Sequence, residues 1–136
     1  LAEGADLLVH ESTNAFLPTL DESQGPAKGA TAESVREKAK EHGHSTPEVA
    51  GEFVRRVGAK RLVMNHLSIK YPDVGEWKEG DSEGVGRKRA MLREIERLAS
   101  EVSGVEAVVA TDFLEIEVPK RKVVIVQEGE ELGIAI

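Results

Sequence analysis

The fold is decided by the stretch STPEVAGEFVRRVGAKRLVMNH, residues 45–66, in which a helix pattern is followed directly by a strand pattern. Thr46 offers a capping hydroxyl just before Pro47, and proline is favoured at the first position of a helix. Apolar side chains then recur at helical spacing until Gly58, namely Val49, Ala50, Phe53, Val54 and Val57. Residues 61–65 form a short apolar run that is typical of a buried strand. We therefore predict a helix over 47–57 and a strand over 61–65.

Similar patterns on both sides of this unit predict an α/β fold. Residues 31–41 have weak helical periodicity, and residues 85–102 form a good amphipathic helix. Because strand and helix patterns alternate, we expect one sheet with helices near 47–57 and 85–101 packed on one of its faces. The strands expected in this sheet are 6–10, 61–65, 107–110 and 114–118, and residues 123–126 are also strand-like. The other face would expose apolar surface.

Composition limits the classes of function that fit the 136-residue chain. This length is enough for one modest domain, and the start at Leu1 suggests a segment of a longer protein. No apolar run approaches the roughly 18 residues of a membrane span, so we expect no membrane partner. The absence of cysteine excludes disulfides and thiolate chemistry. The net charge of −7 argues against a stand-alone nucleic-acid binder, although bound metal ions can let an acidic protein act on a polyanion.

Three short motifs lie at the ends of predicted strands or before a predicted helix. They are His10-Glu11-Ser12-Thr13, Gly43-His44-Ser45-Thr46 and Asn65-His66-Leu67-Ser68. Sites in α/β sheets gather beyond the carboxyl ends of the strands. A carboxylate and an imidazole that meet there can pass a proton to a leaving oxygen, and an imidazole at a strand tip can bind zinc. Each motif alone also has a structural explanation, and we interpret Ser45 and Thr46 as helix caps, with a Ser45–Glu48 capping box as an alternative.

Taken in this order, the motifs resemble the C-terminal half of the tRNase Z family, the tRNA 3′-processing endonucleases with a metallo-β-lactamase fold. That family has a His-Glu-Ala-Thr loop, a His-Ser-Thr motif, and a strand that ends in a metal-binding histidine followed by an aromatic residue and serine. Here Ser12 replaces the alanine and Leu67 replaces the aromatic residue. The resemblance covers about residues 1–119. It implies that this chain is the C-terminal half of an αβ/βα sandwich, whose N-terminal half would precede residue 1.

The resemblance also implies roles for single residues. Glu11 and His44 match the family's paired carboxylate and imidazole, which help to protonate the leaving oxygen, and His66 matches the last metal ligand. We expect the Glu11 carboxylate within about 2.6–3.2 Å of a His44 ring nitrogen. His10 is interpreted as a buried structural residue, and Asp112 as part of a turn or strand end.

The remaining metal ligands of the family would lie before residue 1. They comprise a His-x-His-x-Asp-His motif, a further histidine and a bridging aspartate. His42-Gly43-His44 begins like that motif, but Ser45, Thr46 and Pro47 follow where the motif requires other residues. The intact enzyme should hold two zinc ions, and this segment alone should be inactive because one histidine cannot hold both.

The function implied is that of a zinc-dependent endoribonuclease, which cleaves a phosphodiester at the 3′ end of precursor tRNA. Its partners would be precursor tRNA or another RNA and the N-terminal half of the same protein, with a homodimer left open. Such a substrate implies a location inside the cell, in cytoplasm, nucleus or mitochondrion. Two alternatives remain: a metallo-β-lactamase-fold phosphodiesterase acting on cyclic nucleotides or small diesters, and a non-catalytic half domain that scaffolds a partner.

Overall fold

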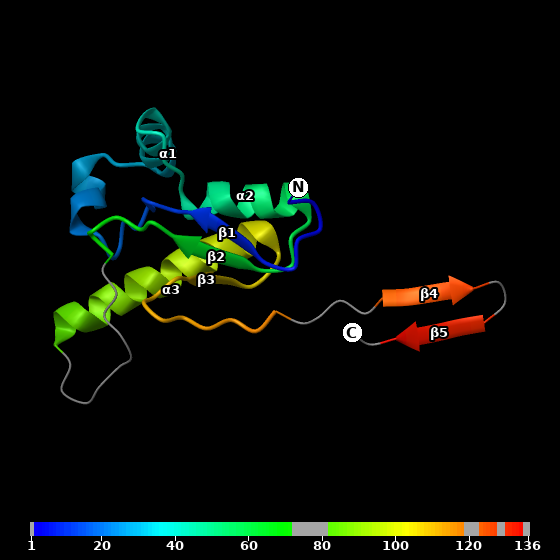
Figure 1. Cartoon of the computed structure of the whole chain (residues 1–136). Coiled ribbons are helices and arrows are strands. Elements are labelled where there is room, and N and C mark those ends of the chain that lie inside the picture. The colour runs from blue at the N-terminus through cyan, green and yellow to red at the C-terminus, as the bar shows by residue number, and fades with distance from the viewer. Residues whose placement is uncertain (1, 72–81, 119–122, 128–129, 135–136) are drawn as a thin grey trace.

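The computed structural model describes residues 2–71, 82–118, 123–127 and 130–134. Its main unit is a parallel sheet with strand order β1-β2-β3, and β4 and β5 form a separate antiparallel pair (Figure 1). The elements in chain order are β1 (Leu8–Glu11), α1 (Ala32–Glu41), α2 (Pro47–Val57), β2 (Leu62–Asn65), α3 (Glu83–Ser103), β3 (Ala107–Val109), β4 (Val123–Gln127) and β5 (Glu130–Ile134), with 3-10 turns at Glu22–Gln24 and Pro26–Lys28. Among the described residues we find no helix with the length and hydropathy of a transmembrane segment.

The helix–strand unit that decided the sequence prediction is confirmed. Helix α2 begins at Pro47 after Thr46 in the cap position, and it ends at Gly58, whose φ of 66° lies in the left-handed region that glycine favours. Strand β2 follows within a few residues and is buried over Leu62–Met64. Helix α3 begins two residues before the predicted start, because the Ser82 side chain accepts a hydrogen bond from the Val85 amide and caps the helix there.

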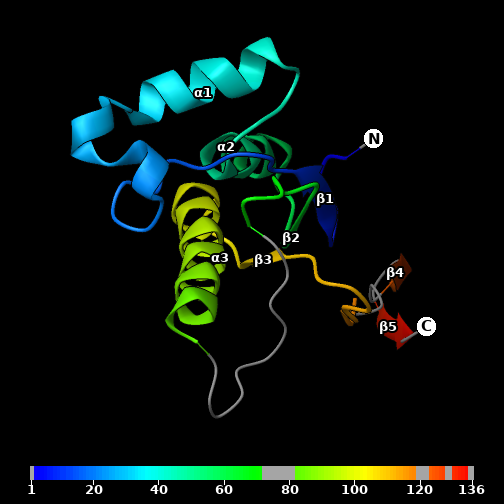
Figure 2. The ribbon, with the colours of Figure 1, turned by 90° about the vertical axis from the view of Figure 1, so that its left-hand side faces the viewer.

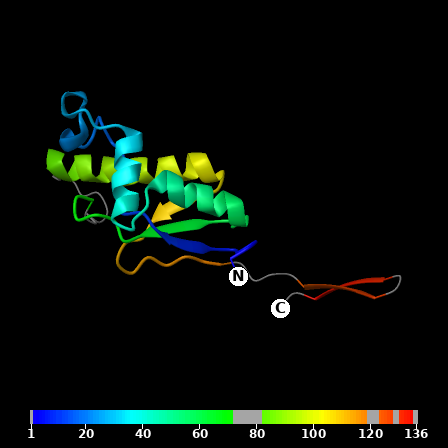
Figure 3. The same ribbon diagram turned by 90° about the horizontal axis from the view of Figure 1, so that it is seen from above.

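The core lies between the sheet and one layer of helices. Figures 2 and 3 show α2 and α3 on the same side of the sheet, as predicted. Leu62 and Met64 of β2 are fully buried, and they belong to one apolar cluster with residues of both helices, namely Ala50, Val54, Ile95 and Ala99. On β1, by contrast, Val9 remains 56% exposed. The sheet therefore has one covered face and some exposed apolar surface, as the sequence predicted.

The prediction that residues 114–118 form a fourth strand of the sheet is wrong. A turn follows β3: the Leu114 amide bonds to the carbonyl of Thr111, and Phe113 has a φ of 65°. This turn carries residues 114–117 along a pocket that Leu7, Leu62 and Val108 also line. There Arg61 donates to the Glu117 carbonyl at 3.0 Å. The alternating pattern therefore marks an irregular segment outside the sheet rather than a paired strand.

Candidate functional site

The three motifs converge at one edge of the sheet. Glu11 is the last residue of β1 and is paired with Asn65, the last residue of β2, so that His66 follows at the same edge. His44 lies two residues before the cap of α2. Each of Glu11, His44 and His66 offers a ligand atom within 4.8 Å of the other two, and the rings of the two histidines are 5.2 Å apart. The structure thus brings together all three predicted site residues.

The contact expected between Glu11 and His44 is longer than predicted. The distance from Oε2 of Glu11 to Nδ1 of His44 is 3.9 Å, which suits an ion pair and is too long for a hydrogen bond. Both oxygens of the carboxylate instead accept hydrogen bonds from hydroxyl groups. Ser45 donates to Oε1, and Thr13 donates to Oε2 at 2.8 Å.

The interpretation of Ser45 as a helix cap is therefore wrong. Its hydroxyl contacts the side chain of Glu11 and also the Glu11 carbonyl, at 2.8 Å. Thr46 does occupy the cap position of α2, but its side chain makes no capping hydrogen bond. Ser45 instead connects the start of α2 to the end of β1.

Hydrogen bonding decides the charge state of Glu11. Burial alone would raise the pKa of this carboxyl group, but the hydrogen bonds from Ser45 and Thr13 outweigh burial and lower the pKa below its usual value. Glu11 is therefore ionised at neutral pH. It places a fixed negative charge beside the His44 ring.

Thr13 connects all three motifs, although no role was predicted for it. Its amide donates to the carbonyl of Ser45 at 3.1 Å, and its carbonyl accepts from the Ser68 amide at 2.8 Å. Its hydroxyl lies 3.0 Å from the carbonyl oxygen of His66 and 3.3 Å from the Nδ1 of that ring. His66 has a φ of 55°, a left-handed conformation that is uncommon for a residue other than glycine. These contacts hold His66 in that conformation.

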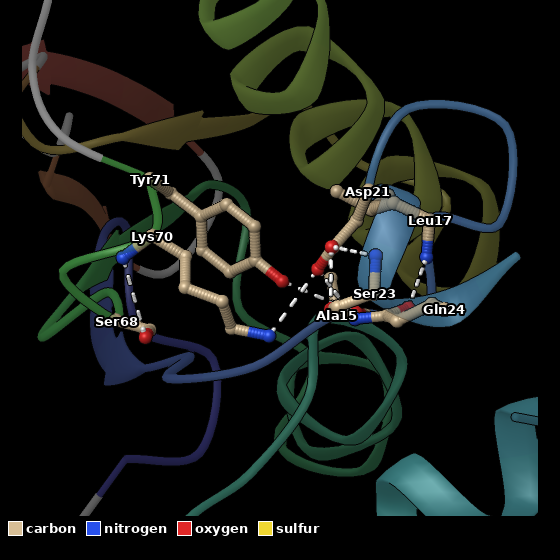
Figure 4. Close-up of polar contacts among 8 residues, drawn as sticks. All are labelled: Ala15, Leu17, Asp21, Ser23, Gln24, Ser68, Lys70 and Tyr71. Carbon is tan, nitrogen blue, oxygen red and sulfur yellow. Dashed lines mark hydrogen bonds and ion pairs between the residues drawn. The ribbon is translucent and has the colours of Figure 1, made fainter. Parts of the chain in front are cut away.

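A second polar network, shown in Figure 4, fixes the loop that follows the first motif. Gln24 accepts from the Leu17 amide at 2.8 Å and donates to the Ala15 carbonyl at 2.9 Å. Lys70 lies 3.2 Å from the Asp21 carboxylate, and the Tyr71 hydroxyl donates to the Ala15 carbonyl at 3.3 Å. Since Lys70 and Tyr71 follow His66 closely in sequence, this network joins the loop of the first motif to the segment that carries His66.

The other histidines lie outside the group of three. His10 is half-buried rather than fully buried, and its ring lies 5.3 Å from the ring of Phe53. His42 is exposed at the end of α1, which agrees with our rejection of it as the start of a metal motif. Asp112 lies in the exposed turn after β3, as expected.

The donor atoms of the three residues fit a zinc ion. Two imidazoles and one carboxylate are a ligand set that catalytic zinc sites use. All of them are side chains at or beside the ends of regular elements, which holds them more rigidly than a free loop would. Neither the carboxylate nor the rings are fully buried, so a bound ion would remain accessible to a substrate.

Comparison with known proteins supports the resemblance seen in the motifs. Zinc phosphodiesterase ELAC protein 1 of Homo sapiens is 37% identical over 118 residues, which is 87% of this chain and 26% of that protein. Ribonuclease Z of Streptococcus agalactiae is 33% identical over 99 residues, 72% of this chain and 26% of that protein. The chain is homologous to these proteins of the tRNase Z family.

Further comparisons define the extent of this relationship. Ribonuclease Z of Methanothermobacter thermautotrophicus is 41% identical over 71 residues, which is 52% of this chain and 18% of that protein. No family model matches the chain. The chain spans about a quarter of the length of the first two relatives. Because the tRNase Z family has the metallo-β-lactamase fold, the parallel sheet with α2 and α3 is part of that fold.

Proposed function

We propose that the intact protein is a zinc-dependent endoribonuclease that cleaves a phosphodiester at the 3′ end of precursor tRNA. The observation that carries the proposal is the convergence of Glu11, His44 and His66, whose ligand atoms lie within 4.8 Å of one another. Relatives named ribonuclease Z and zinc phosphodiesterase support both the reaction and the metal. Their names do not favour either a small-diester hydrolase or a non-catalytic scaffold.

Although all three residues carry donor atoms that zinc can bind, we assign only His66 as a zinc ligand and reserve Glu11 and His44 for proton transfer. Two ions would be held with further ligands from the N-terminal part of the intact protein. Zinc, when bound, supplies Lewis-acid stabilisation of the charged phosphoryl group and lowers the pKa of a bound water. It also supplies positive charge that a chain of net charge −7 needs near a polyanion. The role of His66 is to hold the ion at the tip of β2.

Glu11 and His44 act on the leaving group. Hydrolysis forms a bond between a water oxygen and phosphorus and breaks the bond between phosphorus and the ribose oxygen, so that the departing oxygen needs a proton. The protonated ring of His44 donates that proton, and the ionised Glu11 carboxylate, 3.9 Å away, stabilises the positive ring before the transfer. Ser45 keeps the carboxylate in place through its hydrogen bond to Oε1.

The proposed partners are precursor tRNA and the N-terminal part of the same protein, which would cover exposed apolar side chains such as Val9. We further propose that this part and the present chain form the two halves of one metallo-β-lactamase domain. Action on tRNA would place the protein inside the cell. A homodimer is compatible with this arrangement.

The test compares single substitutions in the intact protein, with cleavage of a precursor tRNA transcript and zinc content as separate measurements. His44→Ala and Glu11→Ala should lower turnover by about 10²- to 10⁴-fold while zinc content stays near normal. His66→Ala should remove one of two zinc ions and abolish cleavage. His42→Ala is a matched control, because His42 is exposed at the end of α1, and it should change neither measurement.

Three results would contradict this assignment. Loss of stoichiometric zinc in His44→Ala would make His44 a ligand instead of a proton donor. Retention of both ions and full activity in His66→Ala would make His66 a structural residue. Hydrolysis of a small chromogenic diester without cleavage of precursor tRNA would favour the small-diester alternative.

A further inference from the structure

The Thr13 hydroxyl lies between the Glu11 carboxylate and the ring of His66, the proposed zinc ligand. It lies 2.8 Å from Oε2 of Glu11 on one side and 3.3 Å from Nδ1 of His66 on the other. The carbonyl oxygen of His66 is a third neighbour at 3.0 Å. The direction of these hydrogen bonds follows from counting protons.

A threonine hydroxyl has one proton to donate and two lone pairs that can accept. The His66 carbonyl can only accept, and Oε2 of Glu11 also accepts, since the same hydroxyl donates to it at 2.8 Å. The single hydroxyl proton therefore goes to one of these two oxygens or is shared between them, and in either case it is not available to Nδ1 of His66. Nδ1 of His66 is the only group in this set that can donate to the hydroxyl. If Nδ1 carried no proton, two lone pairs would face each other at 3.3 Å.

We propose that Thr13 is a positioning residue whose hydroxyl accepts a hydrogen bond from the Nδ1–H of His66, so that Nε2 of His66 is left unprotonated and available to a zinc ion. This inference rests on the proposed function in one respect, the presence of zinc at His66. Histidines that bind metals usually donate their other ring N–H to an oxygen, which fixes both tautomer and ring orientation. Here the oxygen belongs to a hydroxyl that is itself hydrogen-bonded to Glu11.

The backbone contacts of Thr13 make two substitutions informative. The backbone of Thr13 is held at both ends, by Ser45 and by Ser68, so its hydroxyl is fixed relative to the strand ends. Valine has the same shape without the hydroxyl, and serine keeps the hydroxyl without the methyl group. The pair Thr13→Val and Thr13→Ser therefore separates hydrogen bonding from packing.

The first measurement needs no substitution at Thr13. In the intact protein, freed of metal and labelled with ¹⁵N-histidine, two-bond ¹H–¹⁵N spectra at alkaline pH report which ring nitrogen of neutral His66 carries the proton. His66→Gln assigns the signal. We expect the Nδ1–H tautomer in the unsubstituted protein, whereas an unrestrained histidine favours Nε2–H. Finding Nε2–H there would overturn the proposal.

The second measurement is zinc affinity, obtained by competition with a chromophoric chelator. Thr13→Val should return His66 to the Nε2–H tautomer and weaken zinc binding by about 10- to 100-fold, and Thr13→Ser should retain both properties. Thr46→Val is the matched control, because the Thr46 hydroxyl is buried nearby with no hydrogen-bond partner among the described residues. An unchanged tautomer and an unchanged affinity in Thr13→Val would refute the role of Thr13.

These measurements do not use RNA cleavage, so the two proposals can fail separately. A protein with the expected tautomer and the expected loss of zinc affinity that cleaves no precursor tRNA would refute the proposed function and support the Thr13 assignment. A protein that cleaves precursor tRNA normally while His66 carries its proton on Nε2 would refute the Thr13 assignment alone.

Discussion

Replacing Gly51 by alanine tests how closely the two helices that cover the sheet approach each other. Gly51 is buried in the middle of α2. A β-carbon at this position would lie 2.8 Å from the Ala99 carbonyl oxygen of α3 and 3.1 Å from the β-carbon of Val102. The Ala99 oxygen is backbone and cannot rotate away, so the helices would have to separate.

The size of the effect follows from two opposing contributions. Alanine is favoured over glycine inside a helix by about 0.5–1 kcal/mol. Overpacking of a well-packed interface typically costs about 1–3 kcal/mol. We therefore expect Gly51→Ala to lower the free energy of unfolding by up to about 2.5 kcal/mol in net terms, and not to raise it.

Gly86→Ala is the matched control. Gly86 lies in α3, is exposed, and has nothing within 4 Å of an added β-carbon, so only the favourable contribution of about 0.5–1 kcal/mol should appear. Urea denaturation of the intact protein, followed by far-UV circular dichroism, measures both. If Gly51→Ala were stabilising to the same degree as Gly86→Ala, the close approach of α2 and α3 described here would be wrong.

Two further predictions concern the core and the polar network. Met64→Ala should lower the free energy of unfolding by about 2–5 kcal/mol, because Met64 is fully buried. Met91→Ala, at a half-buried position, should lower the free energy of unfolding clearly less. Equal decreases in the two variants would contradict this core. Burial raises the pKa of Asp21, but hydrogen bonds from Ser23 and Lys70 outweigh it and lower the pKa below the usual value. Asp21 therefore stabilises the fold fully at pH values above its pKa in the unfolded chain, about 3.9. This stabilisation is lost as the pH falls through the lower pKa that Asp21 has in the folded protein. Denaturation at a series of pH values between about 5 and 2.5 should show a smaller acid loss for Asp21→Asn than for the unsubstituted protein, and an equal loss would rule out Asp21 as its source.

The sequence alone determined most of the elements and pointed to three residues that the fold brings together. Helix α2 was predicted with its observed bounds, because its start and end are marked locally by Pro47 and Gly58. Strand β2 followed from a short apolar run. The convergence of Glu11, His44 and His66 could also be expected, since parallel strands end at one edge of a sheet.

Tertiary structure decided the hydrogen bonds within the site and the path of the chain after β3. Ser45 has a sequence position that suits a helix cap, but in the fold its hydroxyl meets Glu11, a residue 34 positions away. Thr13 reaches His66 across 53 positions. Residues 114–118 alternate like a strand, yet after the turn at Phe113 residues 114–117 run beside β2 and β3 and do not pair with the sheet. A local sequence pattern indicates which face of an element is apolar and where the element ends. It does not indicate which hydrogen-bond donor will contact which acceptor far away in the sequence, because those contacts depend on how whole elements pack together.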